Sequence, residues 1–422
     1  MDAKAAPRAQ HLNFVRRFGP GLITGAADDD PSGIGTYSQV GAQYGYALAW
    51  TMLFSLPLMI VIQEISARIG CVSGRGIAEN LRQHYPAVLV RGIVLLLLVA
   101  NTINLGADLG AMGAALRLLL GGSARLYTIG FGILCVVAEI FLSYASYAAF
   151  LKWLTLSLFA YVGVAFAVHV PWSQALLATF VPHLTFDAGH ATALVAVLGT
   201  TISPYLFFWQ AGLEVEDARQ RGQSAHGLAS RDAHAQFARI RIDTATGMSI
   251  SNLVAIFIIF ATAATLHASG VTDIQTSSQA AEALRPVAGA FTFVVFAAGI
   301  LGTGLLAVPV LAGSSAYALS EAFQWQEGLD RRLLQAKAFY ATIAVSTLAG
   351  VGLNFTALDP VKALYWSAVV NGVLAAPVMV VLMLLAGNRR VMRDLTLPLP
   401  LLIGGWAATA VMFLASIGLV VF

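Results

Sequence analysis

Three consecutive aspartates, Asp28, Asp29 and Asp30, lie in an apolar stretch near the N-terminus, directly before Pro31. A membrane interior has no water to satisfy a carboxylate or an unpaired backbone group, so such a run is tolerated there only where it lines a polar cavity inside the protein. Asp30 lies at the expected break in the helix and is the best candidate for a cation ligand. Asp28 and Asp29 are expected to assist Asp30 directly, to lie in a solvated vestibule, or to cap a half-helix.

A second interruption lies in residues 199–205, which read Gly-Thr-Thr-Ile-Ser-Pro-Tyr. Pro204 removes a backbone donor and clashes with the preceding turn, so the small and hydroxylated residues before it are expected to unwind. Helices broken at mid-membrane commonly form the binding sites of secondary transporters. Thr200 and Ser203 are therefore candidates for the same site as Asp30.

Other polar side chains in apolar runs supply accessory candidates. Asn101, Asn104 and Asp108 are spaced i, i+3 and i+7, which places them on one face of a helix. Such a stripe either joins helices by hydrogen bonds or lines a water pathway, and the sequence leaves both roles open. The remaining accessory candidates are Tyr205 and Gln210 after the second interruption, Asn371 in a later apolar run, and the lone Glu139.

The composition indicates that membrane-spanning segments position these residues. Of the 422 residues, 58% are hydrophobic and only 11% are charged, whereas a globular protein has about 25% charged residues. Apolar runs long enough to cross a bilayer lie near 18–43, 46–69, 90–119, 126–145, 149–169, 190–214, 243–267, 289–322, 336–354, 361–387 and 398–421. We predict an all-α polytopic membrane protein in which the first and sixth spans are broken.

The positive charges predict the orientation of these spans. With a cytoplasmic N-terminus, all but four of the 24 Lys and Arg residues fall on the cytoplasmic side, as the positive-inside rule expects. We therefore expect a multi-pass protein of the cell (inner) membrane with an external C-terminus. The polar stretch 214–241 is expected to be a cytoplasmic loop. The spread of positive charge does not indicate a nucleic-acid partner, and the two cysteines suggest neither a disulfide framework nor a zinc site.

The first-span residues resemble the NRAMP family of divalent-metal transporters, whose motif reads GPG, DPGN and GAQYGY. The matching residues are Gly19-Pro20-Gly21, Asp30-Pro31-Ser32-Gly33 and Gly41-Ala42-Gln43-Tyr44-Gly45-Tyr46. Residues 199–211 are similar to the family's sixth-span segment, and Ala107-Asp108-Leu109 resembles its T-D-L. The resemblance implies a LeuT-type 5+5 inverted repeat in one domain, with repeats at 18–169 and 190–387 and an extra helix at 398–421. It also implies metal import by alternating access.

The resemblance carries over Asp30 as a ligand, together with the backbone carbonyls of Ala27 and Thr200. It departs at Gly33, where the family has asparagine, and at Ser203, where the family has methionine. A missing thioether points towards a hard cation such as Mg²⁺, with Mn²⁺ as the next candidate. The family's two sixth-span histidines are Tyr205 and Gln210 here, and its two third-span glutamates are Asn101 and Ala111. None of these side chains titrates near neutral pH, so we expect transport that is not strictly proton-coupled.

An alternative on the same scaffold is an APC-type carrier of a small organic solute. The glycines after Asp30 would then bare amides for a substrate carboxylate, and Asp30 would pair with its ammonium group. An enzyme is not expected, because the sequence contains no nucleophile–base constellation. We expect no cofactor, since a divalent metal would be the substrate, and no partner other than that substrate and the lipid bilayer.

Overall fold

The computed structural model describes residues 19–141, 156–185, 187–220, 233–329, 331–356 and 359–422. Within these ranges every regular element is a helix, which agrees with the predicted all-α class. The longer helices are α3 (Trp50–Ser73), α5 (Ala87–Leu120), α6 (Ala124–Phe141), α12 (Ala233–Thr265), α15 (Thr292–Phe323), α16 (Lys337–Leu353), α17 (Pro360–Ala386) and α19 (Leu399–Val421). Eight helical segments of the described chain are long and apolar enough to cross a membrane.

Both predicted helix breaks are present. The first span consists of α1 (Pro20–Asp28) and α2 (Pro31–Tyr44), and the sixth of α10 (Ala188–Thr201) and α11 (Pro204–Gln220). Each second half begins with a proline, whose missing N–H costs nothing at the first helical position. Asp30 caps α2 by accepting the N–H of Gly33. At each break, therefore, a proline follows the end of the first half-helix and begins the second.

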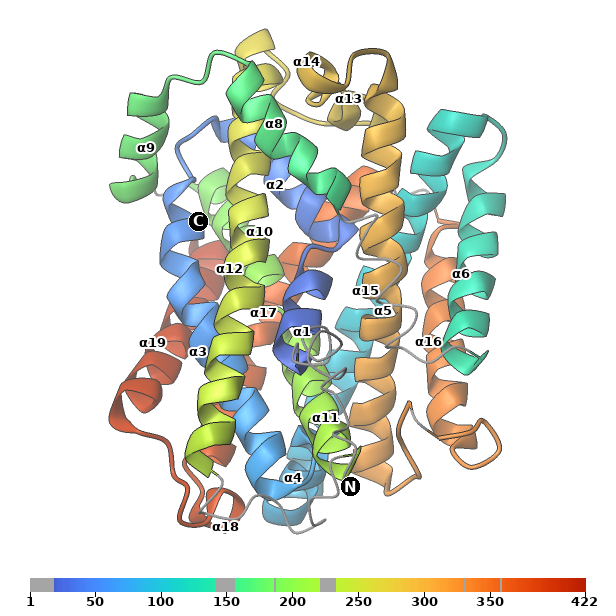
Figure 1. Cartoon of the computed structure of the whole chain (residues 1–422), viewed down its shortest axis with the longest axis vertical. Coiled ribbons are helices and arrows are strands. Elements are labelled where there is room, and N and C mark those ends of the chain that lie inside the picture. The colour runs from blue at the N-terminus through green and yellow to red at the C-terminus, as the bar shows by residue number, and fades with distance from the viewer. Residues whose placement is uncertain (1–18, 142–155, 186, 221–232, 330, 357–358) are drawn as a thin grey trace, which may run out of the picture.

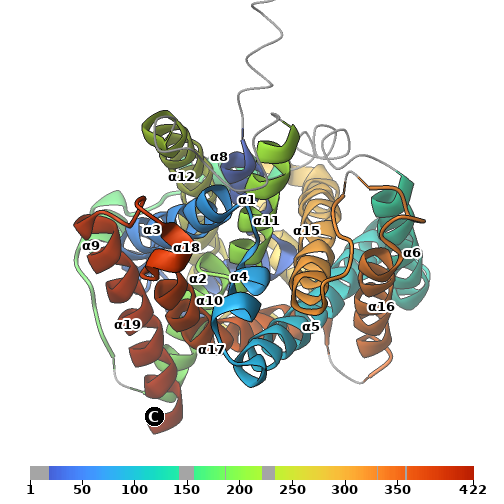
Figure 2. The same cartoon turned by 90° about the horizontal axis from the view of Figure 1, so that it is seen from below.

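The broken helices occupy the middle of the bundle (Figure 1). Here α1 packs on α12, α10 on α17 and α11 on α3, while α5 and α15 pack against each other. Seen from below, α6 and α16 lie at one edge and α19 at the other (Figure 2). Several large apolar side chains of α19 face outwards, among them Leu414 and Val420, as expected of a helix that contacts lipid.

The predicted loop at 214–241 is wrong over most of its length. Helix α11 continues to Gln220 and α12 begins at Ala233, so only residues 221–232, which lie outside the described ranges, remain between them. Charges expected in solvent instead pair between the two helices, because Arg239 donates to Glu214 at 2.5 Å and lies 3.7 Å from Asp217.

Two further segments complete the described chain. The predicted fifth span at 149–169 is described from residue 156 onward, as a 3₁₀ turn η2 (Leu156–Leu158) and α8 (Phe159–Ala167). The polar stretch that follows contains the short helix α9 (Trp172–Phe180). The other short helices are α4 (Ile77–His84), α13 (Ser277–Glu282), α14 (Arg285–Ala288) and α18 (Arg389–Met392).

Candidate substrate site at the helix breaks

Asp30 is fixed at the first break by the residues that follow it. One carboxylate oxygen, Oδ1, accepts the Ser32 hydroxyl and the Gly33 backbone N–H, both at 2.7 Å. The side chain is buried, and it lies at the N-terminus of α2, where backbone amides and the helix dipole favour a negative charge. This carboxylate is therefore held in one orientation before any substrate arrives.

The other oxygen of Asp30 faces two more helices. Asn104 of α5 donates to Oδ2 at 2.8 Å. The hydroxyl of Tyr205, at the start of α11, lies 3.5 Å from the same oxygen and 3.2 Å from the carbonyl oxygen of Ala27. Four helices, α1, α2, α5 and α11, thus converge on one carboxylate.

The second break lies against the first. A Cβ atom placed on Gly33 would lie only 3.0 Å from the Thr200 hydroxyl oxygen and 3.5 Å from Oδ1 of Asp30. Ser203 is buried, and its hydroxyl lies 2.7 Å from the Gly199 carbonyl oxygen and 3.0 Å from that of Thr200. The structure therefore brings Gly33 and Thr200 beside Asp30, while the Ser203 hydroxyl bonds within its own helix.

The polar face of α5 divides into two roles. Asn101 donates to the carbonyl oxygen of Leu311 and to the hydroxyl of Ser315, both in α15, and so joins two helices. Asp108 is fully buried beside Asp30, and apart from the backbone amide of Ser32 its two oxygens face no hydrogen-bond donor. Buried carboxylate oxygens without partners are costly, and a cation or water normally satisfies them. Together with the unpaired Oδ1 of Asn104, Asp108 makes this side of Asp30 rich in unused oxygens.

Asp28 and Asp29 turn away from this group. The Ser251 hydroxyl of α12 lies 2.6 Å from Oδ2 of Asp28 and 2.9 Å from Oδ1 of Asp29. Asp29 and Asp30 separate α1 from α2, so neighbouring carboxylates are directed to different helices. Sequence reasoning did not single out Ser251, because a lone serine in a span carries no signal of its own.

The other accessory candidates lie away from Asp30. Gln210 donates to the Thr244 hydroxyl of α12 at 2.9 Å. Asn371 of α17 and Glu139 of α6 are buried, and their side-chain polar atoms have no hydrogen-bond partner. Sequence reasoning also missed Tyr37, a buried residue of α2 that lies near all three aspartates. No three His, Cys, Asp or Glu side chains of the described chain converge on one metal position, so carbonyl and amide oxygens are needed to complete a site.

The opposite end of α1 is held by a single acid. Asp243 of α12 accepts the backbone N–H groups of Gly19, Gly21 and Leu22 at 3.1, 2.8 and 3.3 Å. It satisfies three of the amides that a helix N-terminus leaves without partners. Further along α1, its contact with α12 is unusually close, since a Cβ on Gly25 would lie 2.3 Å from the backbone of Gly247.

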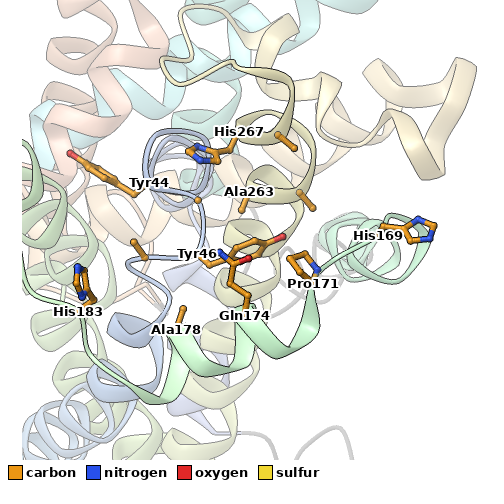
Figure 3. A pocket seen from close by; sticks show the side chains of 13 residues that line it. Tyr44, Tyr46, His169, Pro171, Gln174, Ala178, His183, Ala263 and His267 are labelled. Carbon is orange, nitrogen blue, oxygen red and sulfur yellow. The ribbon is translucent and has the colours of Figure 1, made fainter.

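A pocket of about 520 Å³ lies at the far end of α2, remote from the breaks. It is lined by Tyr44, Tyr46, Gln174 of α9, and His169, His183 and His267. Figure 3 shows the three imidazoles at separate edges of this pocket rather than turned towards one point. The pocket therefore does not add ligands to the site at Asp30.

Comparisons with known proteins match nearly the whole chain. The model of the family described as "Natural resistance-associated macrophage protein-like" (Nramp) matches residues 21–422. A divalent metal cation transporter MntH of Acidiphilium cryptum is 28% identical, over 98% of this chain and 90% of the relative. A MntH of Klebsiella pneumoniae is 27% identical, over 96% and 94%.

Solved structures resemble the fold. The manganese transporter of Eremococcus coleocola, in complex with an aromatic bis-isothiourea compound, superposes with a TM-score of 0.75 at 15% identity and covers 98% of this chain and 88% of its own. Mhp1, a transporter of the nucleobase-cation-symport-1 family, reaches a TM-score of 0.54 at 16% identity, over 95% and 91%. The predicted LeuT-type fold is thereby confirmed.

Proposed function

Because the chain belongs to the Nramp family of transporters, we propose that it carries a divalent metal cation across the membrane through the site at Asp30. The observation that carries this proposal is the pairing of Asp30 with Asp108. Both are buried, they lie close together, and apart from the Ser32 amide the two oxygens of Asp108 face no hydrogen-bond donor. Two carboxylates would neutralise a divalent charge.

The available ligands favour a hard cation. Around Asp30 they are carboxylates, the amide oxygen of Asn104, the carbonyl oxygen of Ala27 and the hydroxyl of Thr200, which faces Gly33. None is a sulfur or a ring nitrogen, and all-oxygen sites suit Mg²⁺ and Mn²⁺ better than softer metals. Mg²⁺ retains several waters and needs only one or two carboxylates. Mg²⁺ is therefore the first substrate to test and Mn²⁺ the second.

The organic-solute alternative is less well supported. It needs free amides at the start of α2, yet Asp30 already accepts the Gly33 amide. The relatives named above are divalent metal cation transporters. Asp30 is only 2% exposed, so a transport cycle requires conformations that open this site to each side in turn.

Metal binding by purified protein tests the proposal. We expect Asp30→Asn to abolish Mg²⁺ and Mn²⁺ binding in calorimetry and uptake in proteoliposomes. Asp108→Asn is expected to weaken binding about a hundredfold or more, because removing one partner of a buried charge costs about 3 kcal/mol or more. The matched control is Glu139→Gln, which neutralises a buried carboxylate of α6 and should leave affinity unchanged. Parent-like affinity in Asp30→Asn would contradict the metal site, and a saturable response to amino acids or carboxylates would favour the alternative.

A further inference from the structure

The outer oxygen of the Asp30 carboxylate depends on one amide side chain. Its inner oxygen, Oδ1, is bonded within the first turn of α2, whereas Oδ2 accepts the side-chain N–H of Asn104 at 2.8 Å. The Tyr205 hydroxyl has a single hydrogen, and the Ala27 carbonyl oxygen at 3.2 Å is a nearer acceptor than Oδ2 at 3.5 Å. Asn104 is therefore the principal donor to Oδ2.

The Asn104 amide has only one favourable orientation beside this carboxylate. With its nitrogen towards Oδ2 it forms a charge-assisted hydrogen bond. The reverse orientation would place the amide oxygen, which can only accept, against a carboxylate oxygen. Asn104 is fully buried, and its own oxygen has no hydrogen-bond partner. One half of the amide is thus paired with Asp30, and the other half is an acceptor without a donor.

A cation bound to Asp30 would reverse this preference. The hydrogens of an amide nitrogen carry partial positive charge, so they would repel a metal ion bound at Oδ2. Rotation of the Asn104 amide by half a turn exchanges its nitrogen for its oxygen with little change of shape, because the terminal torsion of asparagine is roughly two-fold. The oxygen is then a hard ligand of the kind that suits Mg²⁺ and Mn²⁺.

Asp108 is placed to accept the amide hydrogens after such a rotation. It follows Asn104 by four residues in α5, so the two side chains lie on one face of the helix. Apart from the backbone amide of Ser32, the two oxygens of Asp108 face no hydrogen-bond donor. None of the ion pairs among the described residues includes Asp30 or Asp108. The Asn104 nitrogen therefore has a carboxylate acceptor in either orientation.

We propose that Asn104 is a substrate-dependent switch between the empty and the loaded carrier. Its amide nitrogen stabilises Asp30 when no metal is bound, and its amide oxygen coordinates the metal when one is. This inference rests on the proposed function. A buried carboxylate that has released its cation is costly unless another group pairs with it. Asn104 supplies that partner while the empty carrier returns, and so permits net uptake rather than only exchange of one ion for another.

Asn104→Asp separates the two roles, because it keeps an oxygen ligand and removes the amide hydrogens. Proteoliposomes of the purified full-length chain are assayed with radioactive Mn²⁺, or with radioactive Mg²⁺ if the parent binds only that ion. Net uptake into vesicles without internal metal requires the empty carrier to return, whereas exchange against internal metal does not. We expect the ratio of net uptake to exchange to fall about tenfold or more, because the empty site loses a hydrogen bond to a charged group and gains a like charge.

Two further variants complete the design. Asn104→Leu removes donor and ligand together and should weaken metal binding in calorimetry about tenfold or more, whereas Asn104→Asp should retain the parent's affinity. Asn101→Leu is the matched control, because Asn101 is a buried amide of the same helix that donates to α15 instead of Asp30. A loss of helix packing there lowers net uptake and exchange alike and leaves their ratio unchanged.

Several outcomes would overturn the switch. These are an unchanged ratio in Asn104→Asp, an equal fall of the ratio in Asn101→Leu, parent-like affinity in Asn104→Leu, or a parent that exchanges metal without net uptake. If Asn104→Asp does not fold, the affinity of Asn104→Leu decides the result. A parent that binds neither Mg²⁺ nor Mn²⁺ refutes the proposed function, whereas a parent that binds and transports either ion, with an unchanged ratio in Asn104→Asp, refutes this inference alone.

Discussion

The side chain at position 203 separates this chain from the metal ligands expected of its family. Ser203 places a hydroxyl at the second break and bonds it to carbonyl oxygens of its own helix. One of these carbonyl oxygens belongs to Thr200, whose hydroxyl lies beside Gly33 at the first break. A longer side chain at 203 would therefore leave its own helix turn and extend from the break.

Ser203→Met is expected to shift metal preference towards Mn²⁺ and Cd²⁺. A thioether is a soft, polarisable ligand that a hydroxyl cannot replace. The ratio of Cd²⁺ to Mg²⁺ affinity should rise about tenfold, which corresponds to about 1.4 kcal/mol. Competition calorimetry on the parent and the variant measures this ratio. An unchanged ratio would show that position 203 does not face the metal.

Glu327, in the loop after α15, makes stability depend on pH. Burial raises the pKa of its carboxyl group to about 8, against the opposing attraction of Arg219 and Arg331. The unfolded chain releases this proton near pH 4.3. Between these values the native state holds a proton that the unfolded state has lost, so the stabilising contribution is complete at low pH and declines as pH rises to about 8.

Glu327→Gln should therefore flatten the pH profile. Apparent melting temperatures of the parent are expected to fall between about pH 5 and pH 8, and those of the variant to fall less. Glu282→Gln is the control, because the hydrogen bond from Arg285 lowers the pKa of Glu282, and a lowered carboxyl pKa affects stability only at more acidic pH. Equal slopes in parent and Glu327→Gln would contradict the assignment.

At the scale of elements, α1 is a short helix held from outside itself. Three of its N-terminal amides bond to Asp243 of α12, and charge-assisted hydrogen bonds of this kind are stronger than neutral ones. A segment of nine residues is too short to be a stable helix alone. Its position therefore depends on this carboxylate and on the packing against α12.

Asp243→Ala is expected to loosen α1 selectively. The loss of a helix cap costs about 1 kcal/mol, so hydrogen exchange of amides in residues 19–28 should accelerate about fivefold while α5 and α17 are unchanged. Mass spectrometry of peptides from the purified protein measures this. Asp187→Ala removes the cap of α10 and should accelerate exchange in α10 without affecting α1. Parent-like exchange in α1 would show that packing alone holds it.

Local chemistry explains which elements the sequence predicted. Both breaks were predictable, because proline, glycine and acidic residues disrupt an apolar helix within a few positions. The extensions of α11 and α12 were not, because the pairing of Glu214 with Arg239 depends on two helices lying side by side. For the same reason the sequence indicated that three aspartates lie at the break, but not which residues bind them. Asn104 donates a hydrogen bond to Asp30, and the Ser251 hydroxyl lies within hydrogen-bond distance of Asp28 and Asp29.

At the scale of the whole molecule, orientation in the membrane stays a prediction. The distribution of Lys and Arg predicts a cytoplasmic N-terminus. The loop before α13 should then be external and the loop before α16 cytoplasmic. Gln275 and Gln335 are exposed residues of these two loops and report on the two sides.

Cysteine labelling in intact cells is expected to modify Gln275→Cys and to leave Gln335→Cys protected until the membrane is permeabilised. The natural Cys71 and Cys135 are both buried, so the unsubstituted chain serves as the background control. The reverse pattern would show that the chain has the opposite orientation, and labelling of both positions would contradict the span count between them.

The close contact between α1 and α12 also has an evolutionary consequence. Every amino acid that a single base change can substitute for glycine carries a Cβ atom. At Gly21, Gly25 and Gly247 that atom would fall 2.3–2.7 Å from backbone atoms of the facing helix, which cannot move aside as a side chain can. Every amino-acid-changing base substitution in these three codons is therefore expected to be damaging, whereas Gly130 and Gly418 have open space around them. In a library of random point mutants selected for a folded protein, the first three positions should remain glycine while the last two drift.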